Sequence, residues 1–228
     1  MTALLALSEV IESRDPYTRG HSARVARMAH AVGLRLGCDK ARLALLGLGG
    51  ALHDIGKLAV SGTVLNKPGP LTPEELAEVR THPEIGARLV ALDRALRPAL
   101  PGVLYHHERW DGGGYPTGRA GTEIPFEARI LAVADCFDAM TSDRPYRAAL
   151  AAEQAIDEVD RCAGTQFDPD VAIAFVAAWE SGGFGVTAAL RAAAVDTSNT
   201  VLQEPPAAKA NGNGTSHRVL QGESGLEA

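Results

Sequence analysis

Between residues 53 and 135 the chain carries a set of residues that can bind divalent cations. The set is His53, Asp54, His82, His106, His107 and Asp135. Imidazole nitrogens and carboxylate oxygens suit such ions, and one carboxylate can bridge two ions through its two oxygens. Two adjacent cations make hydroxide available near neutral pH. These residues therefore predict a binuclear metal site that carries out hydrolysis.

Each of these residues has a more ordinary explanation when it is considered alone. A single histidine on an apolar helix is usually a core or surface residue, and a buried aspartate usually caps a helix or pairs with arginine. Six of the seven histidines, however, fall in the first half of the chain, and five of those six lie close to the aspartate-bearing segments and the glycine-rich loop. This clustering favours a metal site. His30 is expected to pack or face solvent, and His217 to be idle.

The composition predicts one catalytic domain followed by a tail. The 228 residues are 46% apolar, which suits a single core over residues 1–184. Residues 185–228 are rich in small and polar residues and are expected to be disordered. The net charge of −6 argues against a nucleic-acid polymer as partner, although a small phosphate ligand needs only a few local cations.

The location expected from the sequence is the cytoplasm. The three cysteines lack CxxC spacing, which favours a reducing compartment. No window approaches the ~18 apolar residues of a membrane span, and no signal-peptide pattern is present. We therefore expect no membrane insertion.

Apolar residues recur at helical spacing nearly throughout, and strand patterns are absent. The predicted helices are residues 4–12, 22–36, 40–55, 73–82, 83–92, 97–110, 127–140, 153–162 and 169–179. Thr72 and Asp168 are the expected N-caps of two of them, and residues 111–125 are an expected loop. If the helix from residue 40 continues far enough, His53 and Lys57 share one face and present a ligand and a cation together.

At this level of detail the sequence resembles the HD-GYP phosphodiesterases of the HD superfamily. The matching segments are residues 15–22 (DPYTRGHS), 53–57 (HDIGK), 66–69 (NKPG), 106–112 (HHERWDG), 114–116 (GYP), 128–130 (ARI), 134–135 (AD), 143–147 (DRPYR) and 167–169 (FDP). The resemblance implies an all-α helical bundle with extra C-terminal helices. It also implies hydrolysis of cyclic di-GMP to linear pGpG through a metal-bridging hydroxide, with further cleavage to GMP left open.

The resemblance also implies roles for individual residues. Asp54 bridges two metals, His53 and Asp135 bind one of them, and His82, His106 and His107 bind the other. Asp54 and Lys57 are the implied catalytic residues, and substrate contacts are implied for Lys57, Tyr115, Arg144 and Arg147. Iron or manganese is expected, with nickel and zinc as alternatives, because imidazole with carboxylate suits all four.

The chain departs from the family at Tyr17, where members with three metals have a glutamate one helical turn before the residue that matches His21. A phenol is a poor ligand for hard cations, so a third metal is not expected, and His21 either binds metal or supports a ligand. Two other functions remain open: another HD phosphohydrolase, acting on cyclic GMP-AMP or guanosine polyphosphates, and a non-catalytic receptor or interaction module. A homodimer, or docking to a cyclase or sensor protein, is an open possibility for partners.

Overall fold

The computed structural model describes residues 3–14, 19–143 and 148–184. These residues belong to one compact unit, Met1–Gly185. They form helices and no strand, apart from one isolated bridge between Ala163 and Phe167. The predicted all-α class is therefore confirmed. Tyr17, Arg144, Arg147 and the predicted tail lie outside the described residues.

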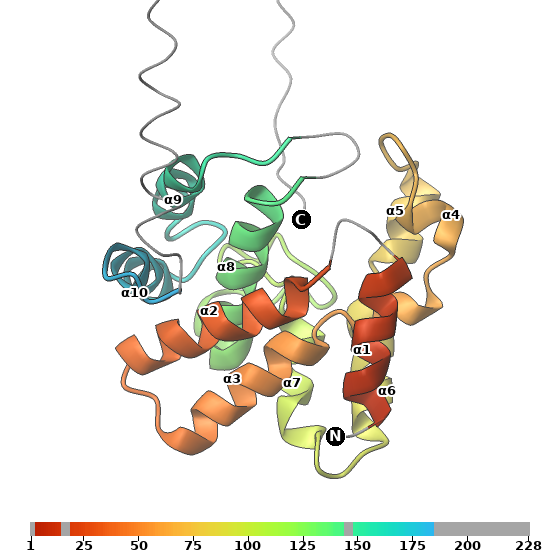
Figure 1. The fold of residues 1–228 in the computed structure, drawn as a ribbon, viewed down its shortest axis with the longest axis horizontal. Helices are drawn as coiled ribbons and strands as arrows, with labels where there is room; N and C mark the ends of the chain where they lie inside the picture. The colour runs from red at the N-terminus through yellow and green to blue at the C-terminus, as the bar shows by residue number, and fades with distance from the viewer. Residues whose placement is uncertain (1–2, 15–18, 144–147, 185–228) are drawn as a thin grey trace, which may run out of the picture. The chain divides into compact units, whose positions relative to one another are not determined.

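The helices follow one another along the chain as Figure 1 shows. Their bounds are α1 (Ala3–Arg14), α2 (His21–Arg35), α3 (Lys40–Leu52), the 3-10 helix η2 (Ile55–Ala59), α4 (Gly62–Leu65), α5 (Pro73–Val79), α6 (His82–Ala91), η3 (Arg97–Ala99), α7 (Leu100–Tyr105), η4 (Gly121–Glu123), α8 (Phe126–Met140), α9 (Ala152–Arg161) and α10 (Pro169–Glu180). No helix among the described residues is long and apolar enough to cross a membrane.

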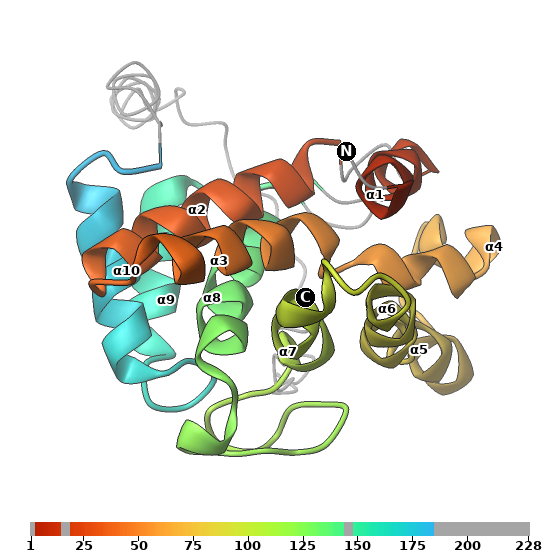
Figure 2. The same cartoon turned by 90° about the horizontal axis from the view of Figure 1, so that it is seen from below.

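A tightly packed pair of helices, α2 and α3, lies at the centre of the bundle. A Cβ on Gly50 would lie 2.5 Å from the Cα of Ala26, so the two backbones can approach this closely only because residue 50 is glycine. Helix α8 packs against both α2 and α3, and α7 lies beside α3 and α8 (Figures 1 and 2). Asp135 on α8 thereby faces the end of α3.

The remaining helices lie on the two sides of this centre. Figure 2 shows α4, α5 and α6 on one side of α7, and α9 and α10 beyond α8 on the other. Helix α1 packs on η2 and α3. An aromatic cluster joins α8 to α10 and to the segment after it, and contains Phe137, Phe175, Trp179 and Phe184. The expected extra C-terminal helices are thus present.

Two predicted helix starts are confirmed by side-chain hydrogen bonds. Thr72 accepts from the backbone N–H of Glu75, and the Glu75 carboxylate accepts from the backbone N–H of Thr72. Asp168 accepts from the backbone N–H groups of Asp170 and Val171. Both caps satisfy amides that the helix itself cannot pair.

Three predicted helix boundaries were wrong. Helix α3 ends at Leu52, and η2 follows, so His53 and Lys57 are not one turn apart on a continuous α-helix. His82 begins α6 instead of ending α5, and Pro83 occupies the first turn, where its missing N–H is harmless. The helix expected over residues 97–110 is two short pieces that end at Tyr105, after which the chain turns into the loop.

Candidate metal centre

The break between α3 and η2 places His53 and Asp54 at the middle of the bundle. The side chain of His53 is fully buried, and that of Asp54 is 12% exposed. Asp54 directs its two oxygens to different sides: Oδ1 lies 3.4 Å from Nε2 of His82, and Oδ2 lies 3.5 Å from Nε2 of His53. This carboxylate therefore stands between two groups of imidazoles, as a bridging ligand would.

Three buried histidines are oriented in the same way by the helix ends that carry them. Nδ1 of His53 lies 2.9 Å from the Gly50 carbonyl oxygen. For His82 and His106 the corresponding carbonyl, again three residues earlier, lies 2.8 Å away. A carbonyl only accepts, so Nδ1 carries the proton in each ring and Nε2 presents its lone pair to the centre.

The facing lone pairs indicate that a cation fits between them. Nε2 of His82 lies 3.2 Å from Nε2 of His106, and neither nitrogen has a proton to donate when Nδ1 is the donor and the ring is neutral. Two lone pairs at this distance repel each other unless a positive charge lies between them. The donor set therefore fits a metal ion.

Burial keeps the imidazoles of His82, His106 and His107 neutral. It lowers the pKa of His82 to about 4 and that of His107 to about 3, and it lowers the pKa of His106 well below its ordinary value. Burial raises the pKa of Asp54, but the neighbouring Lys57, His53 and His82 together leave that pKa well below its ordinary value. Neutral imidazole and ionised carboxylate are the protonation states that bind metals.

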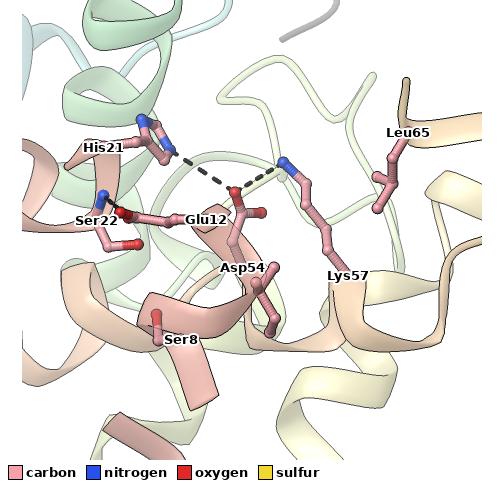
Figure 3. Close-up of a pocket in the computed structure, with 8 residues that line it drawn as sticks. Ser8, Glu12, His21, Ser22, Asp54, Lys57 and Leu65 are labelled. Atoms are coloured by element: carbon pink, nitrogen blue, oxygen red, sulfur yellow. Dashed lines mark hydrogen bonds and ion pairs between the residues drawn. The ribbon is translucent and has the colours of Figure 1, made fainter. Parts of the chain in front are cut away.

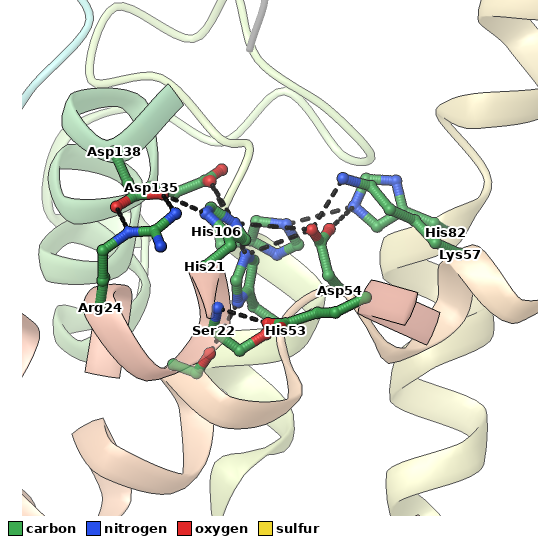
Figure 4. Close-up of polar contacts among 12 residues, drawn as sticks. His21, Ser22, Arg24, His53, Asp54, Lys57, His82, His106, Asp135 and Asp138 are labelled. Carbon is green, nitrogen blue, oxygen red and sulfur yellow. Dashed lines mark hydrogen bonds and ion pairs between the residues drawn. The ribbon is translucent and has the colours of Figure 1, made fainter. Parts of the chain in front are cut away.

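His21, at the start of α2, lies within the same cluster. Its Nε2 is 3.1 Å from Nε2 of His53, 3.2 Å from Asp135 Oδ1 and 3.7 Å from Asp54 Oδ2. Burial lowers the pKa of His21, but hydrogen bonds with Asp135 and Asp138 outweigh it and raise the pKa to about 9. Figure 4 shows His21 beside the carboxylates of Asp135 and Asp138.

The donor atoms form three overlapping groups, and within each group all atoms lie within 4.8 Å of one another. The groups are His82 with His106 and His107, His21 with His53 and Asp54, and His53 with His106 and Asp135. The first is the three-histidine set that the resemblance implies for one metal. The other two groups contain the remaining implied ligands, His53, Asp54 and Asp135, and one of them adds His21.

Lys57 brings a positive charge to the edge of the centre. Its Nζ lies 2.7 Å from Asp54 Oδ2, and the side chain is 22% exposed. Lys57 and Asp54 line a pocket (Figure 3). The other lining residues are Ser8, Ile11, Glu12, His21, Ser22 and Leu65. The ammonium is therefore accessible from the pocket while it contacts the carboxylate between the two imidazole groups.

Glu12 connects α1 to the start of α2. Its carboxylate accepts hydrogen bonds from the backbone N–H groups of Gly20 and Ser22, each at 2.7 Å (Figure 3). Gly20 is the N-cap residue of α2 and Ser22 lies in its first turn, so neither amide has a partner within the helix. Glu12 thus caps α2 from another helix and fixes the position of His21.

The glycine-rich loop packs Tyr115 against His107. The two rings are stacked, with centroids 4.8 Å apart and an interplanar angle of 22°. A Cβ on Gly114 would lie 2.3 Å from the backbone nitrogen of Arg109, so only glycine allows the chain to pass this close. The guanidinium carbon of Arg80 lies 5.3 Å from the Tyr115 ring centroid. Tyr115 therefore supports a predicted ligand with one face of its ring.

Buried Glu108 fixes the other end of this loop. Its carboxylate accepts from the backbone N–H and the hydroxyl of Thr117, both at 2.7 Å, and from the backbone N–H of Arg119 at 3.1 Å. Because Glu108 follows the histidine doublet directly, the loop is tied to the segment that carries two predicted ligands.

The predicted site residues that the structure describes are all brought together. They are His21, His53, Asp54, Lys57, His82, His106, His107, Tyr115 and Asp135. The roles predicted for Arg144 and Arg147 lie outside the described residues. The sequence predicts no role for Glu12, Arg24, Glu108 or Asp138. Only Asp138 had a usable signal, because it follows Asp135 by three residues on one helix and so shares its face.

The chain is similar to known proteins along most of its length. The HD domain family matches residues 6–171. A cyclic di-GMP phosphodiesterase response regulator from Xanthomonas campestris pv. campestris is 42% identical over 171 residues, which cover 73% of this chain and 44% of that protein. A cyclic di-GMP phosphodiesterase from Pseudomonas aeruginosa is 44% identical over 177 residues, which cover 77% of this chain and 42% of that protein.

A crystal structure shows the same fold at lower identity. It is that of a cyclic GMP-AMP specific phosphodiesterase from V. cholerae, with a TM-score of 0.62 and 20% identity, and it matches 89% of this chain and 53% of its own. The chain spans less than half the length of the two curated relatives. The similarity to cyclic di-GMP phosphodiesterases that the motifs predicted is confirmed. The chain belongs to the HD domain family.

Proposed function

We propose that this chain is a metal-dependent phosphodiesterase that hydrolyses cyclic di-GMP to linear pGpG. The observation that carries the proposal is the position of Asp54, with one oxygen toward His82, the other toward His53, and the ammonium of Lys57 beside it. The two similar curated proteins are named for this substrate, which supports the assignment. The reaction adds one water across one P–O3′ bond, and the opened product keeps a 5′ phosphate.

The chain offers ligands for two divalent cations. His82, His106 and His107 would hold one, and His53 with Asp135 would hold the other, with Asp54 between them. His21 lies close enough to the second group to add a nitrogen. When bound, such cations supply Lewis acidity toward a phosphodiester and lower the pKa of a water ligand. We propose that both cations are iron or manganese, and we propose no third ion.

Lys57 is the proposed phosphate-binding cation. Its ammonium reaches Asp54 from the pocket side and is partly exposed, so a phosphate oxygen can approach it without displacing a buried contact. A cation at a non-bridging oxygen stabilises the negative charge that develops during hydrolysis. Arg144 and Arg147 are proposed to extend this clamp on the basis of their motif, and the Tyr115 hydroxyl to contact the substrate.

The experiment is product analysis by chromatography. Protein purified without oxygen, with its iron and manganese content measured, is incubated with cyclic di-GMP, cyclic GMP-AMP or pGpG. We expect cyclic di-GMP to be opened fastest and pGpG to accumulate before any GMP. Faster opening of cyclic GMP-AMP would change the substrate, and tight binding without turnover by fully metallated protein would favour a receptor.

A pair of histidine variants provides the control for the site. His107→Ala removes an imidazole from the three-histidine group, whereas His30→Ala removes an exposed imidazole from α2. We expect the first variant to lose metal and nearly all activity and the second to keep both. Equal activity in the two variants would contradict the site assignment.

A further inference from the structure

His21 is oriented differently from the three histidines that donate to backbone carbonyls. His53, His82 and His106 each follow a turn of chain that supplies a carbonyl three residues earlier. His21, the first residue of α2, has a different partner. Its Nδ1 instead lies 2.7 Å from Oδ2 of Asp138, which reaches it from α8.

Asp138 is itself fixed by Arg24. The carboxylate is buried, and it accepts from Nε of Arg24 at 2.6 Å and from Nη2 at 2.9 Å, a two-point contact that fixes its plane. Arg24 lies on α2, one turn after His21, and its Nη1 donates to the Arg19 carbonyl at 2.9 Å. Figure 4 shows Asp138 beside both Arg24 and His21, next to the other candidate ligands.

We propose that Asp138, fixed by Arg24, is the positioning residue for His21 as a metal ligand, an inference that rests on the proposed metal-dependent function. A carboxylate only accepts at neutral pH, so the Nδ1 proton of His21 is directed to Asp138. Nε2 is then left facing His53, Asp54 and Asp135 when a cation is bound. A carboxylate on the outer nitrogen also makes a ligating imidazole more basic.

A second ion pair, similar to that of Arg24 and Asp138, serves as a control. It distinguishes the positioning of His21 from the simple linking of two helices. Arg129 and Asp168 also form a 2.6 Å contact, and the Asp168 side chain has the same 4% exposure as that of Asp138. Asp168 caps α10, however, and lies outside the three donor groups. Loss of either pair should therefore destabilise the fold, whereas only loss of the Asp138 pair should change metal binding.

The experiment measures Mn²⁺ affinity by titration of the metal-free 228-residue chain, together with the melting temperature. We expect Asp138→Ala to weaken the affinity by about 10–100-fold. Asp138→Asn keeps a carbonyl that can accept from Nδ1, so a smaller loss is expected. Asp168→Asn is expected to lower the melting temperature and leave the affinity unchanged.

A double-variant cycle tests whether Asp138 acts through His21. In a His21→Ala background, Asp138→Ala is expected to cause little further loss of Mn²⁺ affinity, because the ring that it positions is gone. Additive losses, or wild-type affinity in Asp138→Ala, would overturn the inference. If Asp138→Ala does not fold, the Mn²⁺ affinities of Arg24→Gln and Arg129→Gln are compared instead. A weaker affinity in Arg24→Gln alone is then the expected result, and equal affinities would overturn the inference.

The wild-type protein separates this inference from the proposed function. Wild-type protein that binds Mn²⁺ and hydrolyses cyclic di-GMP, with variants that behave like the Asp168 control, overturns the role of Asp138 alone. Wild-type protein that binds no Mn²⁺ overturns both. Normal Mn²⁺ binding without hydrolysis overturns only the proposed activity and leaves the affinity comparison intact.

Discussion

Gly56 lies where η2 meets α6, and replacing it with alanine tests how this contact positions the metal centre. A Cβ at residue 56 would lie 1.9 Å from the carbonyl oxygen of His82 and 2.6 Å from the backbone nitrogen of Gly86. Both obstacles are backbone atoms, so no side-chain rotation can relieve the overlap. The two elements must move apart.

The size of the effect follows from these distances. An ordinary contact begins at 3.4 Å, so the carbonyl of His82 and residue 56 must separate by about 1.5 Å. Overpacking of this kind costs about 1–3 kcal/mol of folding free energy. For a domain of this size, that corresponds to a melting temperature about 2–12 °C lower. The same movement separates His82 from Asp54, and a displacement of about 1 Å in an active site can cost ~100-fold in rate.

The assay compares Gly56→Ala with Gly47→Ala. Gly47 lies in α3, and a Cβ there meets nothing within 4 Å. This control removes a helical glycine without a clash, so it should stabilise the fold by about 0.5–1 kcal/mol. Thermal melting, metal content and the rate of cyclic di-GMP opening are measured for both variants. If Gly56→Ala melts, binds metal and turns over like the wild type, the contact between η2 and α6 does not set the site geometry.

Three further predictions address the site. Lys57→Met is expected to keep the metals and lose 10–1,000-fold in rate, which is about 1.4–4 kcal/mol in the activation barrier. The control Lys40→Met, at the exposed start of α3, should have the wild-type rate. Equal kinetics in the two variants would place the substrate phosphate elsewhere. Gly114→Ala should displace the glycine-rich loop and reduce turnover. The control Gly69→Ala should not, because a Cβ at residue 69 meets nothing within 4 Å. Normal turnover in both variants would show that the position of the loop does not affect catalysis. Removal of metal by a chelator should lower the melting temperature, and Mn²⁺ at 100 times its Kd should restore about 2.7 kcal/mol of folding free energy. His107→Ala should diminish this stabilisation. A melting temperature independent of Mn²⁺ would argue against a metal bound by the folded state.

Features that depend on local sequence could be predicted. The cap at Thr72 and the cap at Asp168 arise from a side chain and amides only two or three residues away, and the structure has both. The end of α3 could not be predicted, because the apolar pattern continues through Ile55. The break at Asp54 accompanies the close approach of Gly56 to α6, which is a contact with a distant segment.

The same distinction applies to the site. The donor types of His53, Asp54 and the histidine doublet indicated metal chemistry, because few other arrangements need so many nitrogen and oxygen ligands. The supporting contacts of Asp138 and Glu108 could not be predicted, since each depends on which partner the fold brings to it. Asp138 meets a residue 117 positions away in the sequence, and no local pattern specifies such a pairing.

The contact between Glu12 and the first turn of α2 has a consequence for where the catalytic unit begins. The carboxylate on α1 occupies two amides that otherwise need water or another acceptor, and His21 lies between them. A shortened chain that starts at residue 19 would retain every metal ligand proposed above, yet its α2 would begin with an uncapped end beside the pocket. The minimal unit for the proposed activity is therefore defined by the last turn of α1 as well as by the proposed metal ligands.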